Sequence, residues 1–152
     1  MQKITTCLWF DGQAEEAMNH YVSIFANSKA GTVNRMPDGK VLGVEFVIEG
    51  QEFMGLNGGP HYAFTPAISL YVDCKTQAEV DRLWKRLLEG GGKEDRCGWL
   101  RDKYGLSWQI IPEALNRLMW DKNRKKGEAV MQAMLKMNKI DIAALQAAYD
   151  AA

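Results

Sequence analysis

The sequence passes twice through one order of expected elements: a short apolar strand, an amphipathic helix, and then two or three short strands. Residues 70–73 repeat the Leu-aromatic-apolar-Asp pattern of residues 8–11 at an offset of 62, and residues 77–79 repeat the Gln-Ala-Glu of residues 13–15 at an offset of 64. A period of about sixty residues is too long for a solenoid repeat and suits a duplicated supersecondary module. We therefore predict an α+β fold of two β-α-β-β-β modules.

Hydrophobic spacing and turn residues place the boundaries of these elements. Strands are expected over 4–10, 30–35, 42–49, 52–57, 67–73, 93–95, 99–103 and 107–111, and helices over 13–27, 77–89, 113–120, 125–136 and from 142 onward. Gly90-Gly91-Gly92 is predicted to end the second helix as a C-cap turn. The chain is expected to form one domain over 1–152, with module one at 1–59, module two at 65–112 and a helical C-terminal tail at 113–152.

Charge and cysteine content exclude several classes of partner. Nineteen basic residues balance nineteen acidic ones, so the chain has no general attraction to nucleic acid or anionic membranes. No apolar run approaches the roughly 18 to 20 residues of a membrane helix. Three cysteines without a Cys-x-x-Cys pair favour reduced thiols. We expect a soluble cytoplasmic protein that binds neither nucleic acid nor membranes.

Several longer segments carry a family resemblance. These are Ile4–Gly12 with Ala14–Ala17, Leu56–Pro60, Cys97–Leu100, Asp102–Gln109 and Lys139–Leu145. They resemble PhnB-like proteins, often labelled as 3-demethylubiquinone-9 3-methyltransferase domains, within the vicinal-oxygen-chelate superfamily of glyoxalases, extradiol dioxygenases and bleomycin-resistance proteins. The resemblance implies the glyoxalase/bleomycin-resistance/dioxygenase fold, a cleft enclosed by the modules, and a homodimer.

The resemblance also implies where a catalytic metal would bind, with one ligand on the first and last strand of each module. Matching the strands puts these four positions at Thr5, Met54, Ala67 and Gln109. Alanine cannot ligate, methionine is a soft donor, and one neutral amide cannot hold a hard divalent ion. His20 and His61 lie outside these strands. We therefore predict no metal and no cofactor.

Side chains in phase with those four positions are expected to face the cleft, because strand side chains alternate. The predicted ligand-binding residues are Thr5, Cys7, Trp9, Met54, Ala67, Ser69, Tyr71, Trp99 and Gln109. Glu52 and Arg101 share this phase, although an ion pair of Arg101 with Asp95 or Asp102 is the favoured interpretation. This mixture of aromatic and polar groups suits a small planar or amphipathic organic molecule. The alternative for Trp9 and Met54 is simple core packing.

The residues do not select a reaction, and no catalytic residue is predicted. Cys7 would need a nearby base to act as a nucleophile. The favoured function is a metal-free cleft that binds a small organic molecule. The alternatives are a metal-dependent enzyme of the glyoxalase or dioxygenase kind, the methyltransferase of the family label, and an interaction module using the methionine-rich tail. No Gly-x-Gly loop opens a helix as a methyl-donor site would require. For the methionines, core packing or a subunit contact is favoured over ligand binding.

Overall fold

A computed structural model describes residues 2–152, and the chain divides after Phe64 into two compact units. The first unit contains β1 (Thr6–Phe10), α1 (Ala14–Ile24), β2 (Lys29–Arg35), β3 (Val41–Ile48) and β4 (Gln51–Asn57). The second unit, Thr65–Ala152, contains β5 (Ser69–Cys74), α2 (Gln77–Leu88), β6 (Lys93–Glu94), β7 (Trp99–Arg101), β8 (Ser107–Pro112), α3 (Glu113–Met119), α4 (Arg124–Met134) and α5 (Ile142–Ala151).

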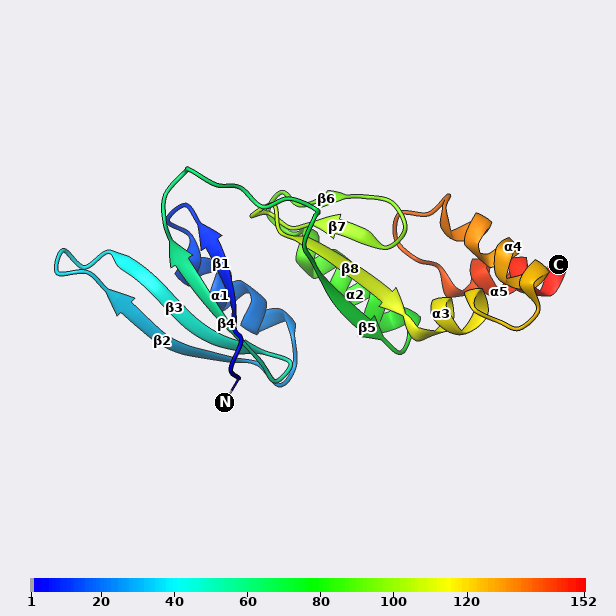
Figure 1. Ribbon diagram of the computed structural model, residues 1–152, viewed down its shortest axis with the longest axis horizontal. Helices are drawn as coiled ribbons and strands as arrows, with labels where there is room; N and C mark the ends of the chain where they lie inside the picture. The colour runs from blue at the N-terminus through cyan, green and yellow to red at the C-terminus, as the bar shows by residue number, and fades with distance from the viewer. Residues whose placement is uncertain (1) are drawn as a thin grey trace. The chain divides into compact units, whose positions relative to one another are not determined.

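The two units share one sheet topology, as the duplicated pattern predicts. The strand orders are β1-β4-β3-β2 and β5-β8-β7-β6. In each unit the first strand runs parallel to the last, and the remaining pairs are antiparallel (Figure 1). The predicted α+β fold of two β-α-β-β-β modules with a helical tail is therefore confirmed. The prediction of one domain over 1–152 stays a prediction.

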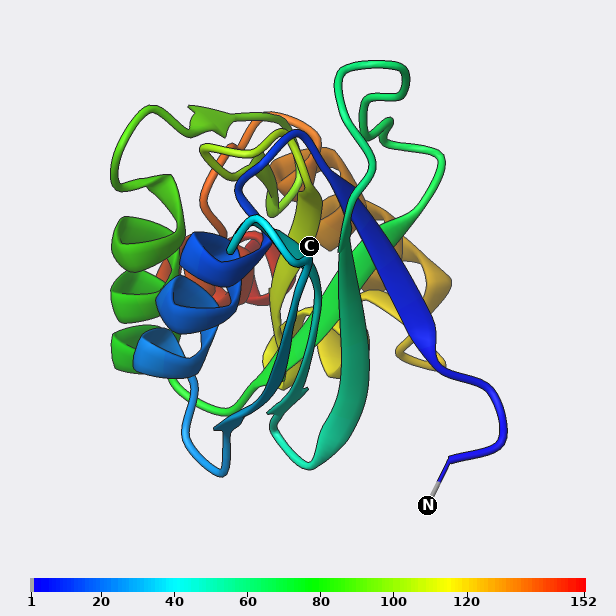
Figure 2. The same ribbon diagram turned by 90° about the vertical axis from the view of Figure 1, so that its left-hand side faces the viewer.

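One face of the first sheet is buried under α1 (Figure 2). Alternate strand residues form this core face, and α1 contributes its own buried stripe; the members are Leu8, Phe10, Val44, Phe46, Ile48 and Phe53 from the strands, with Ala14, Ala17, Met18 and Tyr21 from the helix. The start of α1 lies close to β4 because both contact residues are small: a Cβ on Gly55 would stand 3.4 Å from that of Ala14. Asn57 fixes this approach, accepting a hydrogen bond from the Ala14 amide and donating one to the Val41 carbonyl.

In the second unit, α2 packs on the sheet with the apolar face that the spacing of its hydrophobic residues predicts. Val80, Leu83, Trp84 and Leu87 are buried. The Thr76 side chain caps the helix by accepting from the Glu79 amide. Beyond the helix end, Gly90 and Gly91 adopt φ values of 84° and 121°, which confirms the predicted glycine turn.

The helical tail packs on its own chain. Ile111 joins Leu115, Leu118, Val130, Ile140 and Leu145 in a buried cluster, against which Met119, Met134 and Met137 lie half-buried. The core-packing interpretation of these methionines is confirmed.

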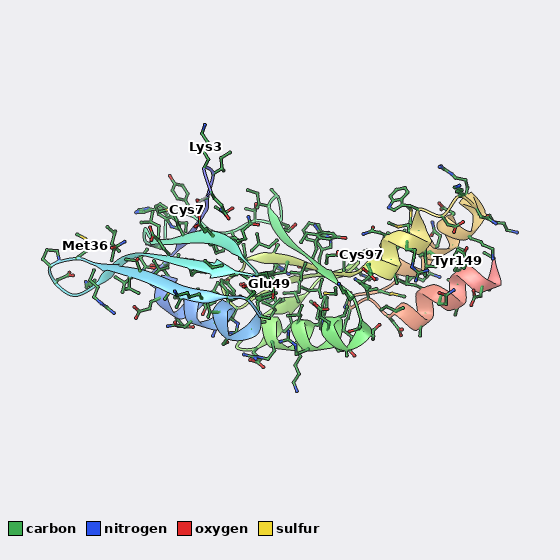
Figure 3. All side chains as sticks on the ribbon, turned by 90° about the horizontal axis from the view of Figure 1, so that it is seen from below. Lys3, Cys7, Met36, Glu49, Cys97 and Tyr149 are labelled. Atoms are coloured by element: carbon green, nitrogen blue, oxygen red, sulfur yellow. The ribbon has the colours of Figure 1, made fainter. Side chains whose placement is uncertain are left out.

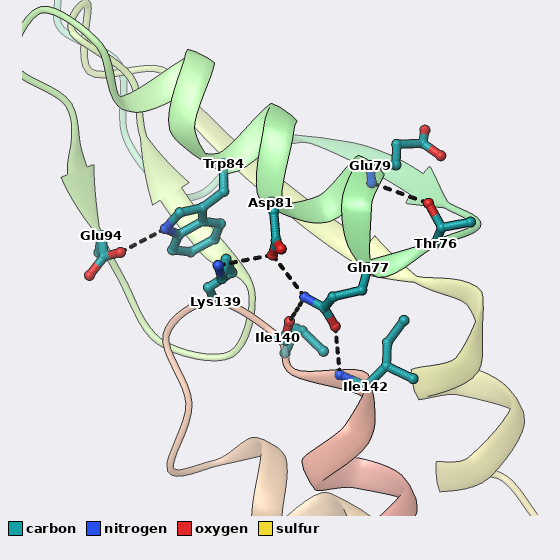
Figure 4. Close-up of polar contacts among 9 residues, drawn as sticks. All are labelled: Thr76, Gln77, Glu79, Asp81, Trp84, Glu94, Lys139, Ile140 and Ile142. Carbon is teal, nitrogen blue, oxygen red and sulfur yellow. Dashed lines mark hydrogen bonds and ion pairs between the residues drawn. The ribbon is translucent and has the colours of Figure 1, made fainter.

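Polar contacts with α2 hold the start of α5 in place (Figure 4). Gln77 donates to the Ile140 carbonyl and accepts from the Ile142 amide, both across sequence distances above sixty residues. Asp81 accepts from Gln77 and pairs with Lys139, and these two donors lower the pKa of its carboxyl. Two further backbone bonds, from Cys97 to Met137 and from Gly98 to Asn138, attach the loop before β7 to the tail.

Within the described residues, none of the helices combines the length and hydropathy that a bilayer crossing demands. The three cysteines are free thiols, as expected.

Candidate functional site

The face of the first sheet opposite α1 has no helix of its own unit over it, and we call it the open face. It carries Cys7 and Trp9 from β1, Glu45 and Val47 from β3, and Glu52, Met54 and Leu56 from β4. Figure 3 shows Cys7 on the side of the sheet away from α1. Buried apolar and more accessible residues alternate along these strands, which is the pattern of a sheet with one covered face.

A hollow of about 380 Å³ lies in this unit. Its lining residues are Gln2, Thr5, Lys29, Gly31, Thr32, Glu45, Phe46, Val47, Glu52, Phe53 and Met54. The hollow therefore combines an apolar wall with hydroxyl, carboxylate and ammonium groups. Such a mixture can hold the apolar body of a small molecule and fix the direction of its polar groups.

A β-bulge in β2 shapes one wall of the hollow. Ala30 pairs with Phe46 and Val33 with Val44, so Gly31 and Thr32 together stand opposite Glu45. An extra residue in one strand bends that strand and changes where nearby side chains point. Glycine is required here, because a Cβ on Gly31 would stand 2.5 Å from the Glu45 carbonyl oxygen.

Replacing Gly31 by alanine is expected to push β2 away from β3 and to lower the free energy of unfolding by about 1 to 3 kcal/mol, the usual effect of overpacking. Urea denaturation would measure the change, with Gly39→Ala as a control at a turn glycine of positive φ without close contacts. In Gly39→Ala the strain comes from the backbone conformation and not from a contact with β3. The amide chemical shifts of β3 should therefore change in Gly31→Ala only. Unchanged β3 shifts in Gly31→Ala would contradict the bulge.

The predicted residues of the first unit divide between the hollow and the loop after β4. Thr5 and Met54 line the hollow. Cys7 is opposite Met54 in the strand register and is exposed. Trp9 instead packs under the loop: its indole N–H donates to the Gly59 carbonyl at 2.9 Å, and its ring lies 4.9 Å from that of Tyr62. For Trp9, the structure therefore shows local packing.

Four of the five predicted residues of the second unit lie side by side on its own sheet. Gln109 is opposite both Tyr71 and Trp99 in the register, and its side-chain amide donates to the Ser69 hydroxyl at 2.9 Å. The Tyr71 hydroxyl accepts a hydrogen bond from Asn116 of α3. Ala67 is the exception, because it lies exposed in the turn before β5. Arg101 makes the predicted ion pair with Asp95, with contacts of 3.0 and 3.1 Å.

The strand register revises the internal alignment of the two modules. Thr6 is opposite Phe53 and Leu70 is opposite Trp108, so with β8 matched to β4 at the predicted offset of 55, β5 follows β1 by 64 residues. The sequence comparison predicted 62 for the first strands. The revised offset makes Ser69 the counterpart of Thr5, in place of Ala67.

The side chains at the metal positions that the family resemblance implies do not fit a metal under either alignment. Thr5, Met54 and Gln109, with Ala67 or Ser69, offer neutral hydroxyl, thioether and amide groups and no carboxylate or imidazole. Over residues 2–152, no three His, Cys, Asp or Glu side chains gather in a group suited to a metal ion. We therefore assign no chemistry to a metal at these positions.

Cys74 is unsuited to nucleophilic chemistry at neutral pH. Burial raises the pKa of its thiol to about 12, with further contributions from the carboxylates of Glu79 and Asp73. Thiolate, the reactive form, is therefore scarce.

Sequence reasoning missed the residues that β2 and β3 contribute to the hollow, namely Lys29, Gly31, Thr32, Glu45, Phe46 and Val47. The signal that could have found them is Gly31 itself, since an isolated glycine within a strand often marks a bulge or a close backbone approach.

Comparisons with known proteins agree with this architecture. The family model described as 3-demethylubiquinone-9 3-methyltransferase matches residues 2–111. Among solved structures, a putative 3-demethylubiquinone-9 3-methyltransferase, the PhnB protein from Bacillus cereus, is 40% identical, with a TM-score of 0.68 over 73% of this chain and 99% of its own. No curated protein matches the chain.

Two more distant structures are similar in fold. A protein from Pseudomonas aeruginosa is 19% identical, with a TM-score of 0.60 over 74% of this chain and 98% of its own. A mutant of the fosfomycin resistance protein FosX from Listeria monocytogenes, complexed with Mn(II) and a dihydroxypropylphosphonic acid, is 14% identical, with a TM-score of 0.53 over 71% of this chain and 90% of its own. The family match ends before α3, so the segment Lys139–Leu145 lies outside it.

Proposed function

The chain belongs to the 3-demethylubiquinone-9 3-methyltransferase family, and from this membership we propose that it binds a small organic molecule in the hollow of its first sheet. The observation that carries the proposal is the hollow itself. Its volume of about 380 Å³ lies within the range of roughly 300 to 1,000 Å³ typical of small-molecule sites. The bulge at Gly31 also supports it, because bulges are common beside functional sites.

The lining suggests how such a molecule would be held. Met54 and Val47 offer an apolar surface, and the flexible thioether of Met54 can adapt to the shape of the ligand. The Thr5 hydroxyl and the carboxylates of Glu45 and Glu52 would orient its polar groups. Ser69, Tyr71, Trp99 and Gln109 remain part of the proposal as a second ligand-facing surface, on the sheet of the second unit.

The proposal includes binding and no reaction. The metal and the phosphonate bound to the fosfomycin resistance protein are properties of that protein. With either Ala67 or Ser69, the matched positions of this chain carry no carboxylate and no imidazole. The family description names methyl transfer, but the sequence has no glycine-rich loop that opens a helix for a methyl donor.

A variant that fills the hollow tests the proposed function. A fragment library would be screened against isotope-labelled protein, with hits identified by amide shifts in β1, β3 and β4. We expect Met54→Trp to weaken these hits at least tenfold by occupying the hollow, whereas Leu42→Trp, a comparably exposed position outside the lining, should leave them unchanged. Hits that are insensitive to Met54→Trp would overturn the site. Stoichiometric divalent metal in the freshly purified protein would favour the enzyme alternative.

A homodimer, which the family resemblance implies, stays a proposal. Its support is the number of large apolar side chains left accessible within the single chain, including Leu42, Met54 and Ile68, which are 46%, 41% and 71% exposed. Accessible apolar surface marks a protein interface where it forms a continuous patch. A native mass of the same sample decides between monomer and dimer.

A further inference from the structure

We propose that the molecule bound in this hollow carries a positively charged nitrogen, as an ammonium or guanidinium group; this inference rests on the proposed function. The hollow has two carboxylates in its lining, Glu45 and Glu52, against the single ammonium of Lys29. Its formal charge is therefore −1 before a ligand enters.

The strand register brings the two carboxylates onto one patch of the open face. Glu45 is opposite Met54 and Glu52 is opposite Val47, so the two glutamates are diagonal neighbours on adjacent antiparallel strands. Such neighbours have Cβ atoms about 7 to 8 Å apart, within reach of one another's long side chains. A cationic group bound over Val47 and Met54 could therefore contact both carboxylates.

No cation of the chain neutralises these carboxylates in the part of the protein that the structure describes. The Glu45 carboxylate forms no hydrogen bond or ion pair there, and the residue is exposed. The Glu52 carboxylate accepts one hydrogen bond, from the backbone amide of Gln2 at 3.1 Å, which is an uncharged donor. Lys29 has no carboxylate oxygen within the 4.0 Å of an ion pair. The negative charge is thus available to a ligand.

The rest of the lining defines the other half of the ligand. Val47 is opposite Glu52 and Met54 is opposite Glu45, so both apolar side chains adjoin the carboxylates on the open face. A fully polar cation would leave the apolar surface of Val47 and Met54 exposed to water, whereas an amphipathic cation would bury it. The chemical class is therefore an organic amine or guanidine with an apolar or aromatic body.

Three probes of similar size but different charge test the inference: phenethylamine, phenethyl alcohol and hydrocinnamate. Each would be titrated into the isotope-labelled protein at low salt, following the amides of Thr5, Val47 and Met54. Ion pairs with accessible carboxylates strengthen binding by about two- to fivefold each. We expect phenethylamine to bind about three- to tenfold more tightly than the alcohol, and hydrocinnamate to bind most weakly. High salt should reduce the difference, because exposed charges are screened.

Charge-removing variants locate the source of the preference. Glu45→Gln and Glu52→Gln should each reduce the preference for the amine over the alcohol by about two- to fivefold, because each removes one negative charge from the lining. Glu49→Gln is the matched control, because Glu49 is exposed in the turn between β3 and β4 and lies outside the lining.

The outcomes separate this inference from the proposed function. Binding of all three probes at these amides with equal affinity, or a preference for hydrocinnamate, would overturn the cationic ligand and leave the binding function standing. Failure of every probe to shift these amides would overturn both. An amine preference that survives both glutamate substitutions would also overturn the assignment to this hollow.

Discussion

Replacing Ile140 by alanine should lower the free energy of unfolding of the second unit by about 2 to 5 kcal/mol. The side chain is fully buried in the cluster that joins β8 to the helical tail. It also reaches the loop before β7, since a Cβ on Gly98 would stand 3.0 Å from Ile140 Cγ1. Removing three carbons here leaves a cavity at the junction of three elements. Urea denaturation followed by far-UV circular dichroism measures the effect.

Leu135→Ala is the matched control, because this leucine belongs to the same tail but is 48% exposed. Its replacement should change the free energy of unfolding by no more than about 0.5 kcal/mol. A small effect of Ile140→Ala would mean that the tail is not docked in solution. Gln77→Ala gives a second readout: it removes the side chain that bonds Ile140 and Ile142, and hydrogen exchange at the start of α5 should then accelerate.

The sequence predicted the duplicated architecture because hydrophobic periodicity is a local property that survives without tertiary information. Leu8 and Phe10 in β1, or Val80 and Leu83 in α2, reveal their buried face by spacing alone. The ion pair of Arg101 with Asp95 could also be predicted, since these residues lie close in sequence across a short hairpin. The hydrogen bond from the Ala14 amide to Asn57 could not be predicted in this way. Asn57 is 43 residues from Ala14 and reaches it only through the parallel pairing of β1 with β4.

The alignment of the modules shows how a local match can mislead. Residues 70–73 match residues 8–11 in composition, yet the registers within the two sheets, with β8 matched to β4 at an offset of 55, make β5 the counterpart of β1 at an offset two residues larger. A slip of two preserves which side chains share a face, because strand alternation has a period of two. Ser69 and Tyr71 therefore remained on the predicted face, while Ala67 fell in the turn before the strand.

The hollow could not be predicted in full because β2 has little local pattern. Most of its side chains are exposed, so no alternation marks its inner face, and the bulge changes the phase midway. Thr5 and Met54 were found by counting along regular strands. Glu45 was missed because its role depends on the residues that β2 places opposite it.

Asp102→Asn is expected to lower the free energy of unfolding by about 3 kcal/mol. The substitution removes the charge of a buried carboxylate that accepts several hydrogen bonds. Asp102 is 3% exposed, and its carboxylate accepts N–H groups that include the amides of Tyr104 and Leu106 at 2.9 and 3.0 Å on one oxygen and the Trp108 indole at 2.9 Å on the other. These bonds shape the turn between β7 and β8. An asparagine has one acceptor oxygen, so its amino group would face an N–H donor.

Asp95→Asn provides the comparison for Asp102→Asn, since Asp95 pairs with Arg101 near the surface and should contribute about 0.2 to 1 kcal/mol. Trp108→Phe removes the donor that the new amino group would oppose. Although this substitution destabilises the core by itself, Asp102→Asn should be less destabilising in the Trp108→Phe background than in the natural chain, and the difference measures the coupling between the two side chains. Equal effects in both backgrounds would show that the indole bond contributes nothing to the effect of Asp102→Asn.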